Sequence, residues 1–265
     1  IIPKINSDSI GKMVAGITRC IGQAGYQCLL ACTNNDSQEE LRYLNSFHDQ
    51  NVDGIILIGT LFTAEHKERL KHLSVPIVIL AQRLDGYSCV YSDDYQASFD
   101  LASRLAKTGH VFGYIGAEAR DEAVGRSRRQ GFEDGLAQAG QGDAPRYYAE
   151  AVFTMESGYE MAKELYTAHS DIDTLLCATD TIASGALRYF HEQGIPVPEQ
   201  IQIAGFGDSS IARATTPTLT TAHFFYEEAG NEAGKILLDM MQEKEHPLNR
   251  ELKLGFSTIV RDSTR

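Results

Sequence analysis

The run Gly54-Ile55-Ile56-Leu57-Ile58-Gly59 decides the fold, because it places four aliphatic residues in a row between two glycines. A strand that is buried on both faces has such an unbroken apolar run, whereas a strand with one face in water alternates apolar and polar residues. Strands of the first kind are typical of parallel sheets that carry helices on either side. The run therefore predicts a central strand in a parallel α/β sheet.

Predicted helices and further strands flank this run along the chain. Upstream, apolar residues recur at helical spacing over residues 10–21, residues 26–32 read as a strand, and Ser37 can cap another helix. Downstream, Thr63 can cap a helix that precedes the apolar strand 75–81. Alternating strands and helices predict right-handed crossovers within a doubly wound lobe.

The same alternation begins again in the second half of the chain. We therefore expect an α/β protein with two Rossmann-like lobes, each a doubly wound parallel sheet, around a cleft. The N-terminal lobe is expected to comprise residues 1–116 and about 223–244. The C-terminal lobe is expected to comprise residues 117–222 and about 249–265. The last helix and the last strand thus add one element to each lobe.

The charge and composition of the chain exclude several classes of protein. Its 265 residues include 24 Lys and Arg against 36 Asp and Glu, which gives a net charge of −12. Surfaces that bind DNA or RNA need clustered basic residues, so we expect this chain not to hold operator DNA by itself. The apolar runs reach less than half of the roughly 20 residues that cross a bilayer, so we expect no membrane partner.

The cysteines and the first residues indicate a setting for the protein. Five cysteines are an odd number, and most lie in apolar runs, which suits a reducing compartment better than a disulfide framework. We therefore expect a cytoplasmic protein. The opening Ile1-Ile2-Pro3 reads as the end of a strand already under way, so we expect an upstream segment.

No arrangement of residues predicts catalysis. The eight histidines are scattered and lack a neighbouring acid and nucleophile in a recognisable pattern. Cys28 and Cys32 share a strand face, but no second Cys or His pair stands at metal-ligand spacing. The stretch 113–116 lacks the glycine pattern of a dinucleotide site. We expect no catalytic residue, no cofactor and no metal.

Polar residues follow the predicted strands at their carboxyl ends, where sheets of this kind bind ligands. Their carboxylates, amides and hydroxyls suit a sugar, because each sugar hydroxyl both donates and accepts hydrogen bonds. The alternative is that such loops are polar in any protein; Asp180, for example, can either cap the next helix or contact a ligand. The set comprises Asn6, Ser7, Thr60, Gln82, Arg83, Asp93, Asp94, Glu118, Asp180 and Asp208.

Three arginines, Arg126, Arg128 and Arg129, stand at the start of a predicted helix. Positive charge there opposes the helix dipole, so the placement costs stability unless an anionic or hydroxyl-rich group compensates. We expect one of the three to bind a ligand. A solvated helix face near Glu133 and Asp134 explains the other two.

Phe or Tyr must supply any aromatic stacking against a sugar ring, because the chain contains no tryptophan. The phenylalanines that lie near predicted strand ends are Phe62, Phe153, Phe206 and Phe224. Each can equally be a core residue.

Several motifs, taken together, resemble the effector-binding core of the LacI/GalR family of bacterial transcription repressors. They occur in the family's order and spacing, and they cover essentially the whole chain. The motifs are Val52-Asp53-Gly54, Gly109-His110 before Gly113, Arg128-x-x-Gly131-Phe132, Ser157-Gly158-Tyr159, Ala178-Thr179-Asp180 before Ala183, Pro217-x-Leu219-Thr220 and the ending Val260-Arg261-Asp262-Ser263-Thr264.

The resemblance implies a type I periplasmic-binding-protein fold, with a sugar or nucleobase between the lobes and a helix-turn-helix domain upstream of this chain. Carried over by position, Arg128 looks like the sugar-clamping arginine and Asp180 like a ligand-binding Asn/Asp. Other residues fall on loops that usually line the cleft in this family. These residues are Asn6, Ser7, Thr60, Gln82 and Phe153.

The chain departs from the family at one ligand position. Members commonly read Gly-Phe/Tyr-Asp, whereas this chain has Gly205-Phe206-Gly207-Asp208. Either Asp208 replaces the missing carboxylate from one residue away, or the site recognises its sugar differently. This variation and the stretch 176–186 are similar to repressors of sucrose-type and trehalose-type operons. Lys4, at the end of the first strand, is then placed to meet a sugar phosphate.

The resemblance implies a non-catalytic switch: the effector binds between the lobes of a homodimer and changes operator affinity. We expect the dimer face on the helix at 10–21, the helix after Thr63 and residues 183–189, whose apolar side chains exceed what one lobe can bury. The alternatives are an extracytoplasmic sugar-binding protein of a transporter and a sugar-modifying enzyme. The first of these predicts a monomer.

Overall fold

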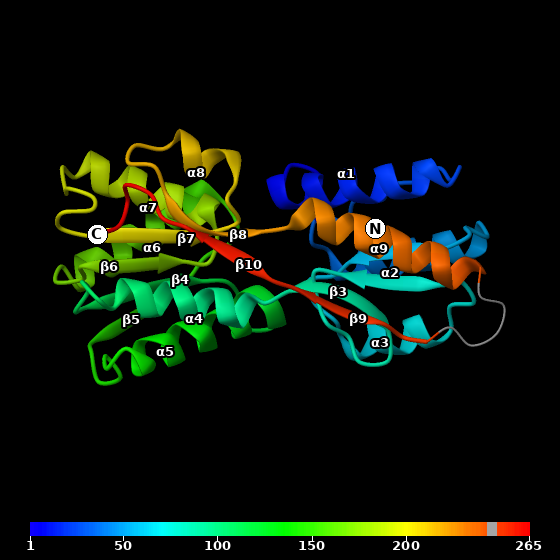
Figure 1. Cartoon of the computed structure of the whole chain (residues 1–265), viewed down its shortest axis with the longest axis horizontal. Helices are drawn as coiled ribbons and strands as arrows, with labels where there is room; N and C mark the ends of the chain where they lie inside the picture. Colours follow the sequence, from blue (N-terminus) through cyan, green and yellow to red (C-terminus); the bar gives the residue numbers. More distant parts are fainter. Residues whose placement is uncertain (243–247) are drawn as a thin grey trace. The chain divides into compact units, whose positions relative to one another are not determined.

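The computed structural model describes residues 1–242 and 248–265 and divides the chain into two compact units (Figure 1). Unit 1 consists of Ile1–Ser92 and Phe225–Gly255. Unit 2 consists of Asp93–Phe224 and Phe256–Arg265. The chain therefore passes three times from one unit to the other, and its last segment contributes to both.

Unit 1 is a parallel sheet covered by helices on both faces. Its strands are β1 (Ile55–Ile58), β2 (Ile77–Leu80), β3 (Ser88–Ser92) and β9 (Glu251–Leu254), in the order β1-β2-β3-β9. Its helices are α1 (Asp8–Gln23), α2 (Ser37–Asp49), α3 (Ala64–Lys71) and α9 (Tyr226–Gln242). Helices α1 and α9 pack side by side (Figure 1), and α2 and α3 are also in contact.

The side chains of the central strands alternate between two apolar clusters of unit 1. Val78 and Leu80 pack with residues of α1 and α9. Ile77 and Ile79 pack with Leu44 of α2 and with residues of α3. Because both faces of the strand are buried, every position must be apolar, which is why the sequence shows unbroken apolar runs here.

Unit 2 is a six-stranded sheet in the order β10-β8-β7-β6-β4-β5. Its strands are β4 (Phe112–Gly116), β5 (Arg146–Glu150), β6 (Thr174–Cys177), β7 (Gln202–Phe206), β8 (Thr220–Phe224) and β10 (Phe256–Ile259), of which only β10 is antiparallel to its neighbour. Its helices are α4 (Asp94–Leu105), α5 (Arg128–Gln138), α6 (Met155–Ala168), α7 (Asp180–Glu192), α8 (Ser210–Ala214) and the π-helix η1 (Glu122–Ser127). Helix α4 packs on α5, and α6 packs on α7.

The boundaries of the units differ from the expected ones. The first crossing lies between Ser92 and Asp93 rather than at residue 116, because β4 pairs with β5 and β6 and α4 packs on α5. The strand predicted at the end of the chain is divided at Gly255 into β9 and β10, which join different sheets. The expected end of the N-terminal lobe near residue 244 lies outside the described residues.

The strand predicted at residues 26–32 is also wrong. Only an isolated bridge between Ile2 and Cys32 forms there. Leu29 and Leu30 keep 60% and 47% of their surface exposed, so this apolar stretch is not covered as a central strand would be. The structure also contains β5, α8 and β8, which the sequence patterns do not predict.

The apolar residues assigned to a dimer face are already buried within the single chain. On α1, Ile10, Met13 and Ile17 pack in the cluster that includes α9. On α7, Ala183 and Tyr189 belong to the core of unit 2. A surplus of apolar side chains therefore gives no argument for a dimer, because one chain buries them.

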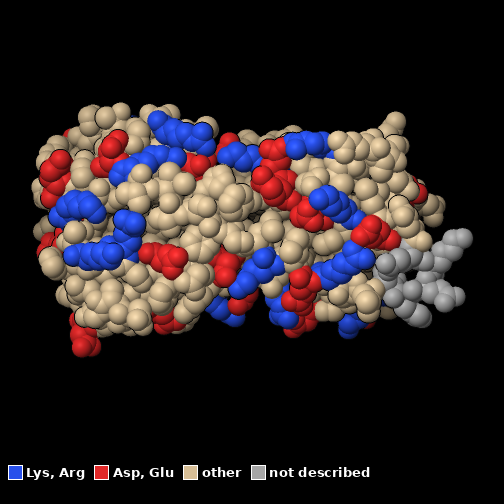
Figure 2. Space-filling model, viewed as in Figure 1, with Lys and Arg blue, Asp and Glu red and all other residues tan. Residues whose placement is uncertain are grey.

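On the face shown in Figure 2, acidic and basic side chains are interspersed. Among the described residues, no helix combines the length and the apolar character needed to span a bilayer.

Candidate functional site: a buried arginine in unit 2

Arg128 is the first residue of α5, and its side chain is buried, with 4% of the residue exposed. Its Nε donates to Oδ1 of Asp94 at 2.8 Å, its Nη2 lies 2.7 Å from the same oxygen, and its Nη1 donates to the carbonyl of Ala178. The guanidinium carbon lies 4.7 Å from the ring centre of Phe206 and 5.1 Å from that of Phe224. The charge is thus paired, hydrogen-bonded and in contact with two aromatic rings.

Local sequence explains why Arg128 reaches this place. Gly131 lets α5 approach α4 closely, because a Cβ there would lie 2.2 Å from the carbonyl oxygen of Tyr95. Asp121 caps the π-helix before α5 by accepting from the N–H of Val124 at 2.9 Å. The close helix pair and the capped π-turn bring the start of α5 against Asp94, the first residue of α4.

The other two arginines of the cluster lie on the surface. Arg126 pairs with Glu122 at 2.9 Å, and Arg129 pairs with Glu133 at 3.1 Å, in each case four residues apart along the chain. These pairs are exposed, and such pairs contribute roughly 0–1 kcal/mol. Arg126 and Arg129 are therefore exposed, but only Arg129 lies near Glu133 as expected, whereas Arg126 pairs with Glu122 of the π-helix; Arg128 is the buried exception.

Burial also raises the pKa of Asp94, although the neighbouring Arg128 guanidinium acts in the opposite direction. A buried carboxylate beside a buried guanidinium keeps its charge only while its partner stays in place. Arg128 and Asp94 are therefore one electrostatic unit, and each depends on the other.

Asp180 is the first residue of α7, and it is almost completely buried, with 1% exposed. Its carboxylate accepts hydrogen bonds from Ser209 N at 2.8 Å, from Ser209 Oγ at 3.0 Å and from Thr221 Oγ1 at 2.6 Å. Burial raises the pKa of Asp180, while the bonds from Thr221 and Ser209 oppose this change. The carboxylate ties α7 to the loop after β7 and to β8.

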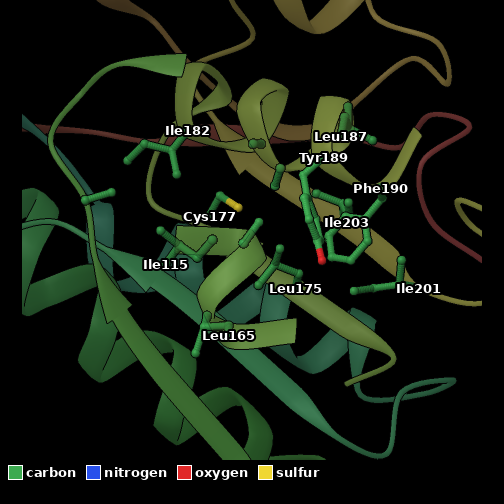
Figure 3. Close-up of a cluster of buried hydrophobic side chains, with 14 of the residues drawn as sticks. Ile115, Leu165, Leu175, Cys177, Ile182, Leu187, Tyr189, Phe190, Ile201 and Ile203 are labelled. Carbon is green, nitrogen blue, oxygen red and sulfur yellow. The ribbon is translucent and has the colours of Figure 1, made fainter. Parts of the chain in front are cut away.

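The cap of α7 is Thr179, not Asp180. The hydroxyl of Thr179 accepts from the N–H of Ile182 at 3.2 Å. Figure 3 shows Ile182, Leu187 and Phe190 of α7 within the apolar cluster that fixes this helix on the sheet. Thr179 is half-buried and lies two residues after the end of β6. Of the two neighbours, Thr179 is therefore the more accessible at this strand end.

Asp208 follows β7 with a left-handed backbone, φ 43°, and is buried. Three basic side chains surround its carboxylate: Arg261 donates to Oδ1, Arg213 donates to Oδ2 at 3.1 Å, and Nδ1 of His223 lies 3.0 Å from Oδ2. Burial raises the pKa of Asp208, but the bonds from Arg261 and His223 outweigh it and leave the pKa below its ordinary value. If Asp208 contacts a ligand, its carboxylate does so while it is also bound by these three side chains.

The candidate residues of unit 1 lie on the loops after β1 and β2 and before α1. Gln82 is buried after β2, and its Nε2 donates to the carbonyl of Thr60, which follows β1, at 3.3 Å. Ser7 precedes α1 and shares a hydrogen bond with Ser9 at 3.1 Å rather than capping the helix. Asn6 is exposed. The structure thus brings Thr60 and Gln82 together.

The last two candidates occupy ordinary positions. Lys4 is half-buried before α1. Phe153 is half-buried and packs on the apolar core of unit 2, where it precedes the α6 cap Thr154. Neither position by itself identifies a ligand contact.

Sequence reasoning missed the roles of several residues. Asp94 belonged to the strand-end set, but nothing linked it to Arg128, which stands 34 positions later. Arg261 and His223 lie far from Asp208 in sequence and gave no local signal. Within the described residues, no group of three acids, histidines or cysteines is arranged to hold a metal ion.

Comparisons with known proteins agree on the family. Residues 102–264 match the profile of a periplasmic binding protein-like domain. The sucrose operon repressor of Staphylococcus xylosus is 29% identical over 249 residues, which is 92% of this chain and 75% of that protein. The HTH-type transcriptional repressor CytR of Escherichia coli (strain K12) is 28% identical over 272 residues, which is 100% of this chain and 78% of that protein.

Solved structures show the same architecture. The transcription regulator GntR of Chromobacterium violaceum superposes with a TM-score of 0.88 at 28% identity, over 99% of this chain and 98% of that one. The match to the domain profile covers more than half of the chain. Over almost its whole length the chain is similar to LacI-family transcriptional repressors. The expected fold class is confirmed: the chain belongs to the family of periplasmic-binding-protein-like domains.

Proposed function

We propose that this chain senses a mono- or disaccharide without converting it, and that sugar binding changes the operator affinity of a helix-turn-helix segment in the full-length repressor. The observation that carries the proposal is the buried guanidinium of Arg128, which lies beside Asp94 and next to the rings of Phe206 and Phe224. A buried ion pair is often no more stable than an apolar replacement, so its retention favours a role in recognition. The name of the sucrose operon repressor supports a sugar as the ligand class.

Arg128 is suited to a sugar because its planar guanidinium has a fixed orientation. The five N–H donors of an arginine form a rigid fork, and aromatic rings beside it offer flat faces to the apolar side of a sugar. Phe206 and Phe224 hold that fork in unit 2 at the ends of β7 and β8. Ligands of parallel α/β sheets bind at these carboxyl ends.

The other candidate contacts remain part of the proposal. For a phosphorylated sugar, Lys4 supplies the positive charge. The remaining proposed contacts are Asn6, Ser7, Thr60, Gln82, Phe153, Asp180 and Asp208. Asp180 and Asp208 would share their carboxylates with the partners described above, so we expect them to act chiefly by holding the site together.

Calorimetric titration against a panel of sugars, sugar phosphates, nucleobases and amino acids tests the ligand class. A bound sugar should also stabilise the fold by RT ln(1 + [L]/Kd), about 2.7 kcal/mol at a hundredfold excess over Kd. Binding of a nucleobase or an amino acid, with no response to any sugar, contradicts the proposed class.

Arg128→Lys tests the residue that carries the proposal, with Arg129→Lys as the matched control. Lysine keeps the charge next to Asp94 but lacks the fixed fork, so we expect sugar affinity to fall at least tenfold. The exposed Arg129→Lys variant should keep the affinity of the unchanged protein. Equal sugar affinity in both variants would mean that Arg128 does not take part in sugar recognition.

We also propose that the working unit is a cytoplasmic homodimer, as the LacI-family resemblance implies. All five cysteines are unpaired, which agrees with a reducing compartment. To change operator affinity a hundredfold, the effector must favour one conformation by about 2.7 kcal/mol. Sedimentation at micromolar concentration should give a species near twice the chain mass of 29.2 kDa. A single species at the chain mass favours the transport-protein alternative.

A further inference from the structure

The positive charge of Arg128 is already neutralised by a residue of the chain itself. Its Nε donates to Oδ1 of Asp94 at 2.8 Å, and its Nη2 lies 2.7 Å from the same oxygen. The side chains of Arg128 and Asp94 keep only 5% and 7% of their surface exposed, so water screens the pair weakly. A ligand at Arg128 therefore meets one half of a neutral pair and not an isolated cation.

The contact with Asp94 also uses the edge of the guanidinium that binds anions best. Arginine commonly holds a carboxylate or a phosphate by two roughly parallel N–H···O bonds. In this structure the Nε and Nη2 of Arg128 both point to Asp94. A carboxylate or phosphate of a ligand would have to share this edge with Asp94 or displace it.

Two further carboxylates lie near the pair. Asp121 is buried and caps the π-helix η1 by accepting from Val124 N, and Asp93 caps α4 by accepting from Gln96 N at 3.3 Å. Burial is the main cause that raises the pKa of Asp94, and the charges of Asp121 and Asp93 raise it further. The buried guanidinium is thus accompanied by three carboxylates.

A buried hydroxyl without a partner lies beside the same groups. Tyr114 of β4 is 1% exposed, and within the part of the chain that the structure describes its hydroxyl has no hydrogen-bond partner. Its ring stacks on Phe132, one turn of α5 after Arg128, with the ring centres 5.0 Å apart. A Cβ on Gly116 would lie 2.7 Å from its Cε1, so the ring leans towards the carboxyl end of β4.

The hydroxyl of Tyr114 lies within electrostatic reach of the ion pair. Burial raises the pKa of Tyr114, the charge of Arg128 opposes this change, and the charge of Asp94 adds to it. An unpaired buried hydroxyl is unfavourable, so a neutral polar group that pairs with it gains binding free energy. This second observation points to a missing uncharged partner at the same place.

We propose that Asp94 makes the Arg128 position selective for an uncharged, hydroxyl-bearing part of the ligand and against a carboxylate or a phosphate. This inference rests on the proposed function and specifies the ligand group at one residue. An anion bound at Arg128 would stand beside the Asp94 carboxylate, and like charges repel strongly where water is scarce. A sugar hydroxyl adds no charge and can both donate and accept. The inference concerns the group at Arg128 alone, so a phosphate bound by Lys4 is compatible with it.

Asp94→Asn tests the proposal, with Asp100→Asn as the matched control. Both variants replace a carboxylate of α4 by an amide, but Asp100 is exposed. The asparagine oxygen at position 94 can still accept from Arg128, whereas the negative charge is removed. Calorimetric titrations use sucrose, D-glucose and D-galactose as uncharged probes and D-gluconate, D-glucuronate and D-galacturonate as anionic probes. The affinity for the anionic probes relative to the uncharged ones should rise at least tenfold in Asp94→Asn and stay unchanged in Asp100→Asn.

A second measurement needs no sugar. Inorganic phosphate should raise the thermal midpoint of Asp94→Asn more than that of Asp100→Asn or of the unchanged protein, because the guanidinium can then bind the anion. Asp121→Asn leaves the pair of Arg128 and Asp94 intact, and its amide oxygen can still accept from Val124 N. It should shift the selectivity in the same direction by a smaller factor, and it replaces Asp94→Asn if that variant does not fold.

The outcomes separate this inference from the proposed function. Sugar binding with the same selectivity in all the proteins overturns the inference alone, as does an equal response of all of them to phosphate. A preference of the unchanged protein for an anionic probe over its uncharged counterpart also overturns it. Absence of binding by every sugar contradicts the proposed function, while the phosphate comparison still decides whether Asp94 excludes anions from Arg128.

Discussion

The two units of this chain present their candidate ligand residues in different ways. In unit 2, Arg128, Asp180 and Asp208 are buried, and each is held by two or more partners from other elements. In unit 1, Asn6 is exposed and the hydroxyl of Ser7 shares a hydrogen bond with Ser9, two residues away. The candidate residues of unit 2 are therefore held in place by other elements before a ligand binds, to a greater extent than Asn6 and Ser7 of unit 1.

This difference has energetic consequences. A side chain already fixed by its neighbours loses little conformational freedom on binding, whereas ordering a mobile one costs about 0.5–1.5 kcal/mol. Substitutions in the unit 2 set should therefore reduce fold stability and ligand affinity together. Substitutions in the exposed loops of unit 1 should affect affinity alone. The predictions below use this contrast, in order of decreasing effect.

Arg128→Ala should have the largest effect. It leaves the Asp94 carboxylate buried without its Arg128 partner and removes the group that contacts the rings of Phe206 and Phe224. Breaking a buried ion pair in this way costs about 3–5 kcal/mol of unfolding free energy. Urea denaturation measures the loss. Arg129→Ala, an exposed neighbour, is the control and should change stability by no more than about 0.5 kcal/mol. Equal effects would mean that Asp94 does not depend on Arg128.

The comparison also shows which parts of the molecule could be predicted from sequence. The run at 54–59 identified a central strand because burial on both faces leaves a local signature, and β1 lies there. Arg128 stood out because positive charge at a helix start conflicts with the helix dipole. Both signals come from residues close together in the chain.

Other features could not be predicted because they depend on distant residues. Nothing near α4 indicates which sheet the helix will cover, so the first unit boundary was placed after β4 instead of before α4. Asp208 and Arg261 meet across 53 positions. The sequence 26–32 has a strand's composition, but a strand also needs a neighbour, and only residues 31–33 pair with Ile2.

Asp180→Asn should cost an intermediate amount. The substitution replaces one carboxylate oxygen by an NH2 group, which then faces donors from Ser209 or Thr221. A buried donor left without an acceptor costs about 1–3 kcal/mol, and thermal or urea unfolding should show a loss of this size. Asp143→Asn on the exposed loop before β5 is the control and should leave stability unchanged. An unchanged Asp180→Asn protein means that the carboxylate is not needed to tie α7 to β8.

Asn6→Ala should have the smallest effect on the fold and is the sharpest test of the contrast. Asn6 is exposed, so its loss should change the unfolding free energy by less than about 0.5 kcal/mol. If it contacts the sugar, losing one neutral hydrogen bond costs about 0.5–1.5 kcal/mol of binding free energy, a twofold to tenfold fall in affinity. Calorimetric titration measures the fall, and Gln23→Ala, equally exposed at the far end of α1, is the control. A change in stability without a change in affinity would place Asn6 with the structural residues of unit 2, and the contrast between the units would fail at this residue.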